Sequence, residues 1–263
     1  MPAASETDIS ATKMRDGRGR AVLIMACCAQ LALGVAGFVF FHARHLRLEQ
    51  RLLRASAETI AADPALIRFA VAEAKPLYAQ HCASCHGADL HGNSTLGAPD
   101  LADRVWMYGN GGIYDIERTL LYGIRSGESR SRNVTEMPAF GLTGRLTPAQ
   151  IRSAVQYVLQ LSGRPYAAGA AAEGKELYVG AGGCYDCHGY DARGNSDYGA
   201  PDLTRNVWNS GGDPQSLYNA LYFGQRRLMP AWFGPLNLVQ IRSLAVYLYA
   251  TSRAAPPAAA VKY

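Results

Sequence analysis

The sequence predicts a mainly α-helical protein in which one N-terminal transmembrane helix precedes two tandem domains of similar sequence. Three observations support this fold class. Residues 21–41 form an apolar run, the same ordered motifs occur twice between residues 73 and 252, and apolar residues recur at helical spacing near the end of each copy. A chain of 263 residues has room for an anchor and two domains of about 100 residues each.

The apolar run at 21–41 contains one strongly polar residue, Gln30. At about 1.5 Å per residue, roughly 20 apolar residues cross the hydrocarbon core of a membrane. A cleaved signal peptide is the alternative, but its apolar region is usually about 7–15 residues long and ends in small residues, whereas this run continues to Phe41. We therefore predict an uncleaved anchor in membrane lipid, between an N-terminal segment at 1–20 and a helical connector at 42–72.

The formal net charge of +5 does not indicate nucleic-acid binding. Basic residues are common at the ends of a membrane span, and much of the positive charge of this chain lies there. The sequence shows no basic stripe interleaved with aromatic residues, so we expect no nucleic-acid partner. The flanking basic residues are Lys13, Arg15, Arg18, Arg20, Arg44, Arg47, Arg51 and Arg54.

Four of the six cysteines lie in two C-x-x-C-H pentapeptides, at 82–86 and 184–188, and the other two lie inside the apolar run. Two thiols three positions apart can each form a thioether with a vinyl group on one haem edge, and the adjoining histidine is then placed to ligate the iron. A redox dithiol or half of a zinc site is the alternative, but zinc needs a second ligand pair nearby. The sequence therefore predicts two covalently bound haem c groups, attached at Cys82 and Cys85 and at Cys184 and Cys187.

The two motifs belong to a duplicated unit whose later segments match in the same order. The matched pairs are 92–94 with 194–196, 97–101 with 199–203, Trp106 with Trp208, 137–140 with 229–232, and 150–153 with 240–243. We therefore predict consecutive domains at 73–163 and 173–252, with a linker at 164–172 and a flexible tail at 253–263. An extra polar loop at 125–136 is either a solvated loop or a contact for a partner subunit.

Each copy is expected to contain three helices, and the last of them is amphipathic. Thr147 followed by Pro148, and Asn237 in the second copy, are suitable residues for starting these closing helices. The expected helices are at 74–80, 113–122 and from 148 in the first copy, and at 174–179, 214–222 and from 238 in the second.

Met137 and Met229 occupy matching places, each within a Met-Pro-Ala-aromatic segment. A methionine is usually core filler, but a matched pair in haem domains indicates the sixth iron ligand. We expect His86 and Met137 to ligate the first iron and His188 and Met229 the second, with Met107 as a fallback for the first. Thioether ligation raises the reduction potential and fills both axial positions, so the pattern indicates an electron carrier with no catalytic residues of its own.

Four further residues are expected beside the haems. The carbonyl groups of Pro99 and Pro201 could accept a hydrogen bond from Nδ1 of the ligating histidine and fix its ring. Trp106 and Trp208 are expected either to pack on a haem or bond a propionate, or to fill the core.

From about residue 57 onward the chain resembles the dihaem subunit, subunit III, of cbb3-type cytochrome c oxidases, which implies two tandem class I cytochrome c domains after the anchor. The resemblance covers about three quarters of the chain. It departs at residues 1–20, which lack the acidic segment with Pro and Trp that family members carry. The segments that carry the resemblance are 61–66, 82–87, 97–109, 123–126, 136–141 and 226–234.

The resemblance implies that the chain relays electrons from a soluble or membrane cytochrome c to the monohaem subunit, and on to the haem–copper catalytic subunit that reduces oxygen. Haem attachment on the outer face of the bacterial cytoplasmic membrane predicts periplasmic haem domains and a cytoplasmic N-terminus. One alternative is a tethered dihaem carrier that serves a periplasmic dehydrogenase. Another is a dihaem peroxidase or thiosulfate-oxidising enzyme, which needs an open or differently ligated iron.

Overall fold

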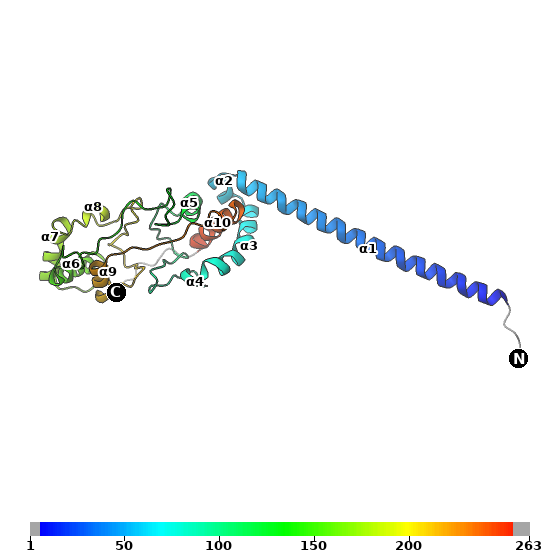
Figure 1. The fold of residues 1–263 in the computed structure, drawn as a ribbon, viewed down its shortest axis with the longest axis horizontal. Coiled ribbons are helices and arrows are strands. Elements are labelled where there is room, and N and C mark those ends of the chain that lie inside the picture. Colours follow the sequence, from blue (N-terminus) through cyan, green and yellow to red (C-terminus); the bar gives the residue numbers. More distant parts are fainter. Residues whose placement is uncertain (1–5, 255–263) are drawn as a thin grey trace, which may run out of the picture. The chain divides into compact units, whose positions relative to one another are not determined.

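The computed structural model describes residues 6–254, so most of the predicted tail at 253–263 and the first five residues lie outside the described residues. Within the described range the chain forms ten α-helices, and its β-structure consists of isolated bridges (Figure 1). This architecture confirms the predicted mainly α-helical class. The chain divides into two units, Met1–Arg51 and Leu52–Tyr263.

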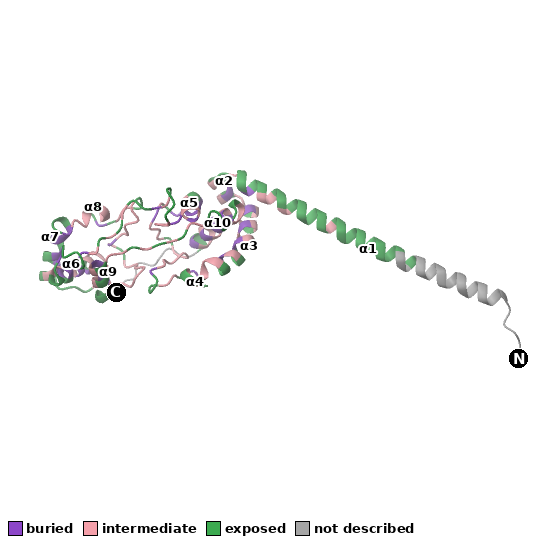
Figure 2. Cartoon of the chain, in the orientation of Figure 1, coloured by how far each residue is buried: buried purple, intermediate pink, exposed green. Residues whose placement is uncertain are grey.

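The first unit contains most of a single long helix, α1 (Glu6–Arg54), whose last three residues belong to the second unit. Its segment Met25–Arg54 is long and apolar enough to cross a membrane, and the apolar window in it is 0% buried. Large side chains such as Leu33 and Phe38 are more than 70% exposed along it, and most of the described part of the helix is drawn as exposed in Figure 2. An apolar helix exposed on all sides suits a lipid environment, and the helix continues without a break beyond the predicted anchor at 21–41.

The second unit begins with α2 (Ala57–Ala62) and α3 (Pro64–His81). Asp63 caps α3 by accepting the backbone N–H groups of Ala65 and Leu66, and Pro64 fills the first helical position. These are favourable residues for a helix start, which explains why α3 begins well before the predicted residue 74.

The other helices agree with the sequence pattern at most positions. Thr147 and Gln150 form a reciprocal capping box before α6, and Asn237 and Gln240 exchange the same two bonds before α10. The helix before the second motif, α7, begins at Ala168, inside the predicted linker. The remaining helices are α4 (Ala83–His86), α5 (Ile113–Tyr122), α6 (Pro148–Leu161), α7 (Ala168–Val179), α8 (Tyr185–His188), α9 (Pro214–Phe223) and α10 (Leu238–Ala254).

The closing helices of the two copies are exchanged. The last helix, α10, packs against α3 and α5 of the first copy, whereas α6 packs against α7 and α9 of the second. We call α2–α5 with α10 the first packing group, and α6–α9 the second packing group. The expected boundaries at 73–163 and 173–252 follow the sequence repeat, but they do not coincide with these packing groups.

Burial of apolar side chains explains why the exchanged helices are held in place. On α6, Ile151, Val155 and Leu159 are almost fully buried in a cluster with Leu177 of α7 and Leu221 of α9. On α10, four large aliphatic residues are 5% exposed or less, and buried residues of α3 and α5 lie on the helices opposite them. Apolar burial of this kind is the main favourable contribution to packing. The α10 residues are Ile241, Leu244, Val246 and Leu248.

Two glycines allow the chain to cross between the groups. Gly123 and Gly224 end α5 and α9 with φ values of 70° and 74°, in the left-handed region. A Cβ on Gly123 would lie 2.4 Å from the carbonyl oxygen of Met229, and one on Gly224 would lie 2.7 Å from that of Met137. Both the backbone conformation and the close approach therefore require glycine.

One buried ion pair is specific to the first packing group. Arg242 on α10 donates to both carboxylate oxygens of Glu117 on α5, at 2.9 and 3.1 Å. It also donates to the backbone carbonyl of Leu53 at 2.9 Å. The equivalent residue of the first copy, Arg152 on α6, is exposed.

Candidate haem sites

Each C-x-x-C-H motif forms a single helical turn, α4 or α8. All four cysteines are free thiols, and burial raises the pKa of Cys82 and of Cys184 to about 11. Redox dithiols and metal-bound cysteines depend on thiolates with a lowered pKa. In the described residues no three His, Cys, Asp or Glu side chains are grouped to hold a metal ion. A pair of thiols on one turn, the first of them kept neutral by burial, therefore fits thioether formation better than a redox or zinc site.

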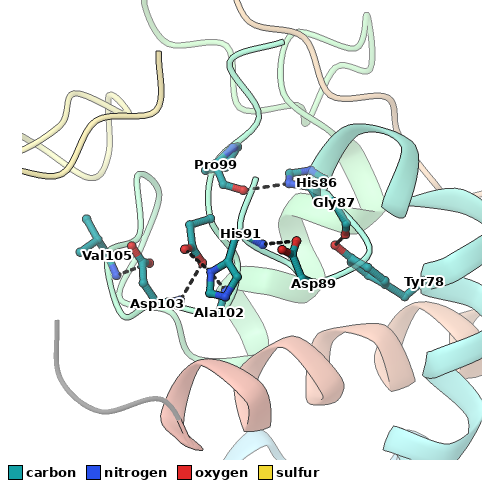
Figure 3. Close-up of polar contacts among 10 residues, drawn as sticks. Tyr78, His86, Gly87, Asp89, His91, Pro99, Ala102, Asp103 and Val105 are labelled. Carbon is teal, nitrogen blue, oxygen red and sulfur yellow. Dashed lines mark hydrogen bonds and ion pairs between the residues drawn. The ribbon is translucent and has the colours of Figure 1, made fainter. Parts of the chain in front are cut away.

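The histidine of each motif is oriented by a proline carbonyl from the loop that follows. The Nδ1 atom of His86 lies 3.1 Å from the carbonyl oxygen of Pro99 (Figure 3), and that of His188 lies 3.0 Å from the carbonyl oxygen of Pro201. Burial lowers the pKa of both imidazoles, and the proline carbonyls oppose this effect only partly. A neutral ring that donates through Nδ1 keeps the Nε2 lone pair available for iron.

Two tyrosines support these turns, and the sequence analysis missed them. The hydroxyl of Tyr78 donates to the carbonyl of Gly87 at 2.7 Å (Figure 3), and that of Tyr178 donates to the carbonyl of Gly189 at 2.6 Å. Burial raises the pKa of both phenols, so they remain donors at neutral pH. A Leu-Tyr pair precedes each motif, and that repeated pair was the available signal.

The two methionines lie in the packing group opposite to their own copy. Met137 packs on the core of the second group, as Trp208 also does, and its carbonyl accepts from the N–H of Gln225 at 3.1 Å. Met229 and Ile124 exchange two backbone hydrogen bonds of 2.9 Å beside α5. Three residues after Met229, the Trp232 ring lies 5.3 Å from the ring of His81, which immediately precedes the first motif.

These contacts bear on the expected ligand pairs, His86 with Met137 and His188 with Met229, which remain predictions. The closing helices pack against the opposite copy. The backbone of Met229 pairs with Ile124 of the first packing group, and that of Met137 pairs with Gln225 of the second. Met107, the expected fallback, is 2.9 Å from the side-chain amide nitrogen of Asn209, its counterpart in the second copy. It therefore lies at a contact between the two copies.

The tryptophans and the extra loop also have defined surroundings. The indole N–H of Trp208 donates to the side chain of Asn206 at 2.9 Å, and its ring packs on two core clusters, while Trp106 is half-buried. In the loop at 125–136, Arg132 is 8% exposed and donates to Thr119 of α5 at 2.8 Å. The end of this loop is thus anchored on α5, while its middle is exposed.

A helical fold with two such turns, each ending in a half-buried neutral histidine, defines a c-type cytochrome with tandem cytochrome c domains. The sequence profile of the family described as "Cytochrome C oxidase, cbb3-type, subunit III" matches residues 69–158 and 169–248. This chain belongs to that family. Membership implies covalently bound haem c and other oxidase subunits as partners, and the apolar N-terminal helix fits a single membrane anchor.

Characterised relatives agree with this assignment. The chain is 37% identical over 202 residues to the cbb3-type cytochrome c oxidase subunit CcoP of Cereibacter sphaeroides, covering 77% of this chain and 68% of that protein. It is 40% identical over 199 residues to the subunit FixP of a Bradyrhizobium species, covering 75% and 67%. To the CcoP subunit of Rhodobacter capsulatus it is 36% identical over 210 residues, covering 77% and 69%.

Proposed function

We propose that this chain is the dihaem electron relay of a cbb3-type oxidase. It takes electrons from a soluble or membrane cytochrome c and passes them to the monohaem subunit and then to the haem–copper catalytic subunit. The observation that carries this proposal is the presence of two equivalent sites, each with a pair of thiols and a half-buried neutral histidine bonded to a proline carbonyl. Each site lies within one of the two segments that match the family.

The exchanged packing supports His86 and Met229 as axial ligands of the haem attached at Cys82 and Cys85. By the same argument His188 and Met137 serve the haem attached at Cys184 and Cys187. When bound, haem c supplies a one-electron couple at its iron, and a thioether ligand raises its reduction potential. With histidine and methionine in both axial positions the chain offers no open coordination site, so oxygen reduction belongs to the catalytic subunit.

The proposed location follows from the attachment chemistry. Haem c is attached outside the bacterial cytoplasmic membrane, so residues 52–254 lie in the periplasm. The single apolar helix then crosses the inner membrane with its N-terminus in the cytoplasm. Its exposed apolar side chains support contact with lipid.

The relay proposal is tested by purifying the tagged chain from mild-detergent membranes and recording the pyridine haemochrome spectrum. Haem b together with two haem c groups, a polytopic partner and oxygen consumption are expected. Two haem c groups without haem b or an oxidase partner would overturn the oxidase assignment in favour of a tethered carrier that serves a periplasmic dehydrogenase.

The ligand pairs are tested with Met137→Leu and Met229→Leu, each introduced into a chain that has lost the second attachment site through Cys184→Ala and Cys187→Ala. In this background Met229→Leu is expected to lower the potential of the remaining haem and open its iron to carbon monoxide, whereas Met137→Leu leaves both unchanged. The reverse result would support ligand pairs within each copy, His86 with Met137 and His188 with Met229.

A further inference from the structure

Two arginines outside the axial sites remain without an acidic partner. Arg125 and Arg227 are both half-buried, and among the described residues no carboxylate forms an ion pair with either of them. Arg125 donates to the backbone carbonyls of Arg227 and Thr135, and its Nε–H is buried with no acceptor. The side chain of Arg227 donates to the side chains of Gln225 and Ser210. We call these two residues the arginine pair.

This arrangement is electrostatically unfavourable without an anion. The two residues are adjacent in space, and the charge of Arg125 opposes the charge of Arg227, which burial already disfavours. Neutral acceptors satisfy some of their N–H groups but balance none of their charge. Half-buried like charges at close range are normally retained where a ligand of opposite charge completes the site.

The place of Arg227 identifies the edge of a haem. It lies two residues before Met229, on the methionine side of the first haem. Its guanidinium also covers Gly97, where a Cβ would lie 2.7 Å from Nε, and Gly97 is two residues before the Pro99 carbonyl that orients His86. A side chain that contacts segments on both axial sides of one haem lies at the edge of the macrocycle and not on its face.

The edge in question is the one that carries the propionates. The thioether bonds fix the vinyl edge at α4, and the propionates of a c-type haem lie on the opposite edge of the ring. None of the hydrogen bonds of the arginine pair goes to α4. Arg125 also bonds Thr135, two residues before Met137, and Arg227 bonds Ser210, two residues after Trp208, so the pair borders segments of the second site as well.

We propose that Arg125 and Arg227 bind the propionate carboxylates of the haem attached at Cys82 and Cys85, at the border between the two haem sites. The planar guanidinium with its parallel N–H groups matches a carboxylate better than any other side chain does. The pair neutralises negative charge next to the iron, which favours the ferrous state and raises the potential of this haem. This inference rests on the proposed haem sites and adds the residues that hold the acidic edge.

The test compares the variants Arg227→Gln and Arg226→Gln in the full-length chain. Arg226 is the matched control, because it is one residue away, carries the same charge, is exposed and pairs with Glu136 at 3.3 Å. Arg227→Gln is expected to shift the reduction equilibrium of one haem toward the ferric state by threefold to tenfold, where tenfold corresponds to about 59 mV for one electron. It is also expected to shift the propionate bending mode in the resonance Raman spectrum, whereas Arg226→Gln leaves that mode in place.

The two proposals fail in different ways. A wild-type chain without two haem c groups in low-spin, methionine-ligated form contradicts the proposed function. Two such haems, with a potential and a propionate mode that are the same in Arg227→Gln as in Arg226→Gln, contradict the arginine inference alone. If Arg227→Gln loses haem, Arg227→Lys keeps the cation but loses the paired N–H groups, and its propionate mode decides the question in the same way.

A small anion from solution is the alternative ligand of the arginine pair. A groove of about 400 Å³, lined by Ser210, Gly97 and Arg226 among others, opens beside Arg227 and gives solutes access to it. The reduction potentials of the wild type and of Arg227→Gln are therefore measured with and without inorganic phosphate. A wild-type potential that is independent of phosphate supports the propionate assignment. A potential that changes with phosphate in the wild type, but not in Arg227→Gln, would assign the pair to a free anion and overturn it.

Discussion

The exchange of closing helices makes a direct prediction about cutting the chain between its two copies. A protease site inserted after Gly163, an exposed residue that ends the first copy, would divide the protein into a part with α1–α6 and a part with α7–α10. In the crossed arrangement each part supplies one helix to the core of the other. Cleavage should therefore leave one compact particle with both haems still ligated.

The buried side chains of the exchanged helices give the free energy that holds the two parts together. The exchanged helices bury seven large aliphatic side chains to 5% exposure or less, and each contributes about 1.5–3 kcal/mol on burial, or about 10–20 kcal/mol together. Buried residues of the facing helices, such as Leu66 on α3 and Leu177 on α7, add to this contribution. Association of two separate chains costs about 4–15 kcal/mol, which leaves a clear surplus in favour of association. The seven are Ile151, Val155 and Leu159 on α6 and Ile241, Leu244, Val246 and Leu248 on α10.

The assay is gel filtration of the cleaved protein in detergent, followed by absorption spectroscopy at the methionine–iron band. The uncut protein that carries the inserted site is the control for the insertion itself. Co-elution of both parts with an unchanged band is expected. Separation into two compact, single-haem species that keep the band would refute the exchange and restore two consecutive domains.

Three further outcomes are expected. Arg242→Ala leaves Glu117, which is 8% exposed, without its partner and should lower the free energy of unfolding by about 3–5 kcal/mol in chemical denaturation. Arg152→Ala, at the equivalent exposed position, should change it by less than about 0.5 kcal/mol. Equal losses in the two variants would contradict this expectation. Gly123→Ala should weaken the methionine–iron band more than Gly127→Ala, since both glycines have positive φ but a Cβ on Gly127 meets nothing within 4 Å. A hydrogen bond to Asp100 raises the pKa of His91 above the ordinary value of 6.5. This contact therefore stabilises the fold fully below about pH 6.5 and less as pH rises through the folded-state pKa. A wild type that loses no more stability than His91→Asn between pH 6 and 8 would contradict this expectation.

Several features followed from the sequence because their causes are local. The position of α5, the helix start at Thr147 and Pro148 and the attachment turns depend on residues a few positions apart. The proline carbonyls at Pro99 and Pro201 were also expected, since the loops that carry them repeat at a fixed distance from each motif. Spacing is sufficient for such features because the groups that interact belong to one short stretch of chain.

The partners of the closing helices depended on the tertiary structure. The faces of α6 and α10 are similar because the two copies are related, so periodicity marks each helix as buried without saying which copy covers it. The choice rests on long-range contacts and on the turns at Gly123 and Gly224 that carry the chain across. The arginine pair was hidden for the same reason, since Arg125 and Arg227 stand at different places in the repeat and meet only once the copies cross. The sequence by itself indicated the class of cofactor and the cysteines proposed to attach it, whereas only the folded chain showed which copy each closing helix packs against.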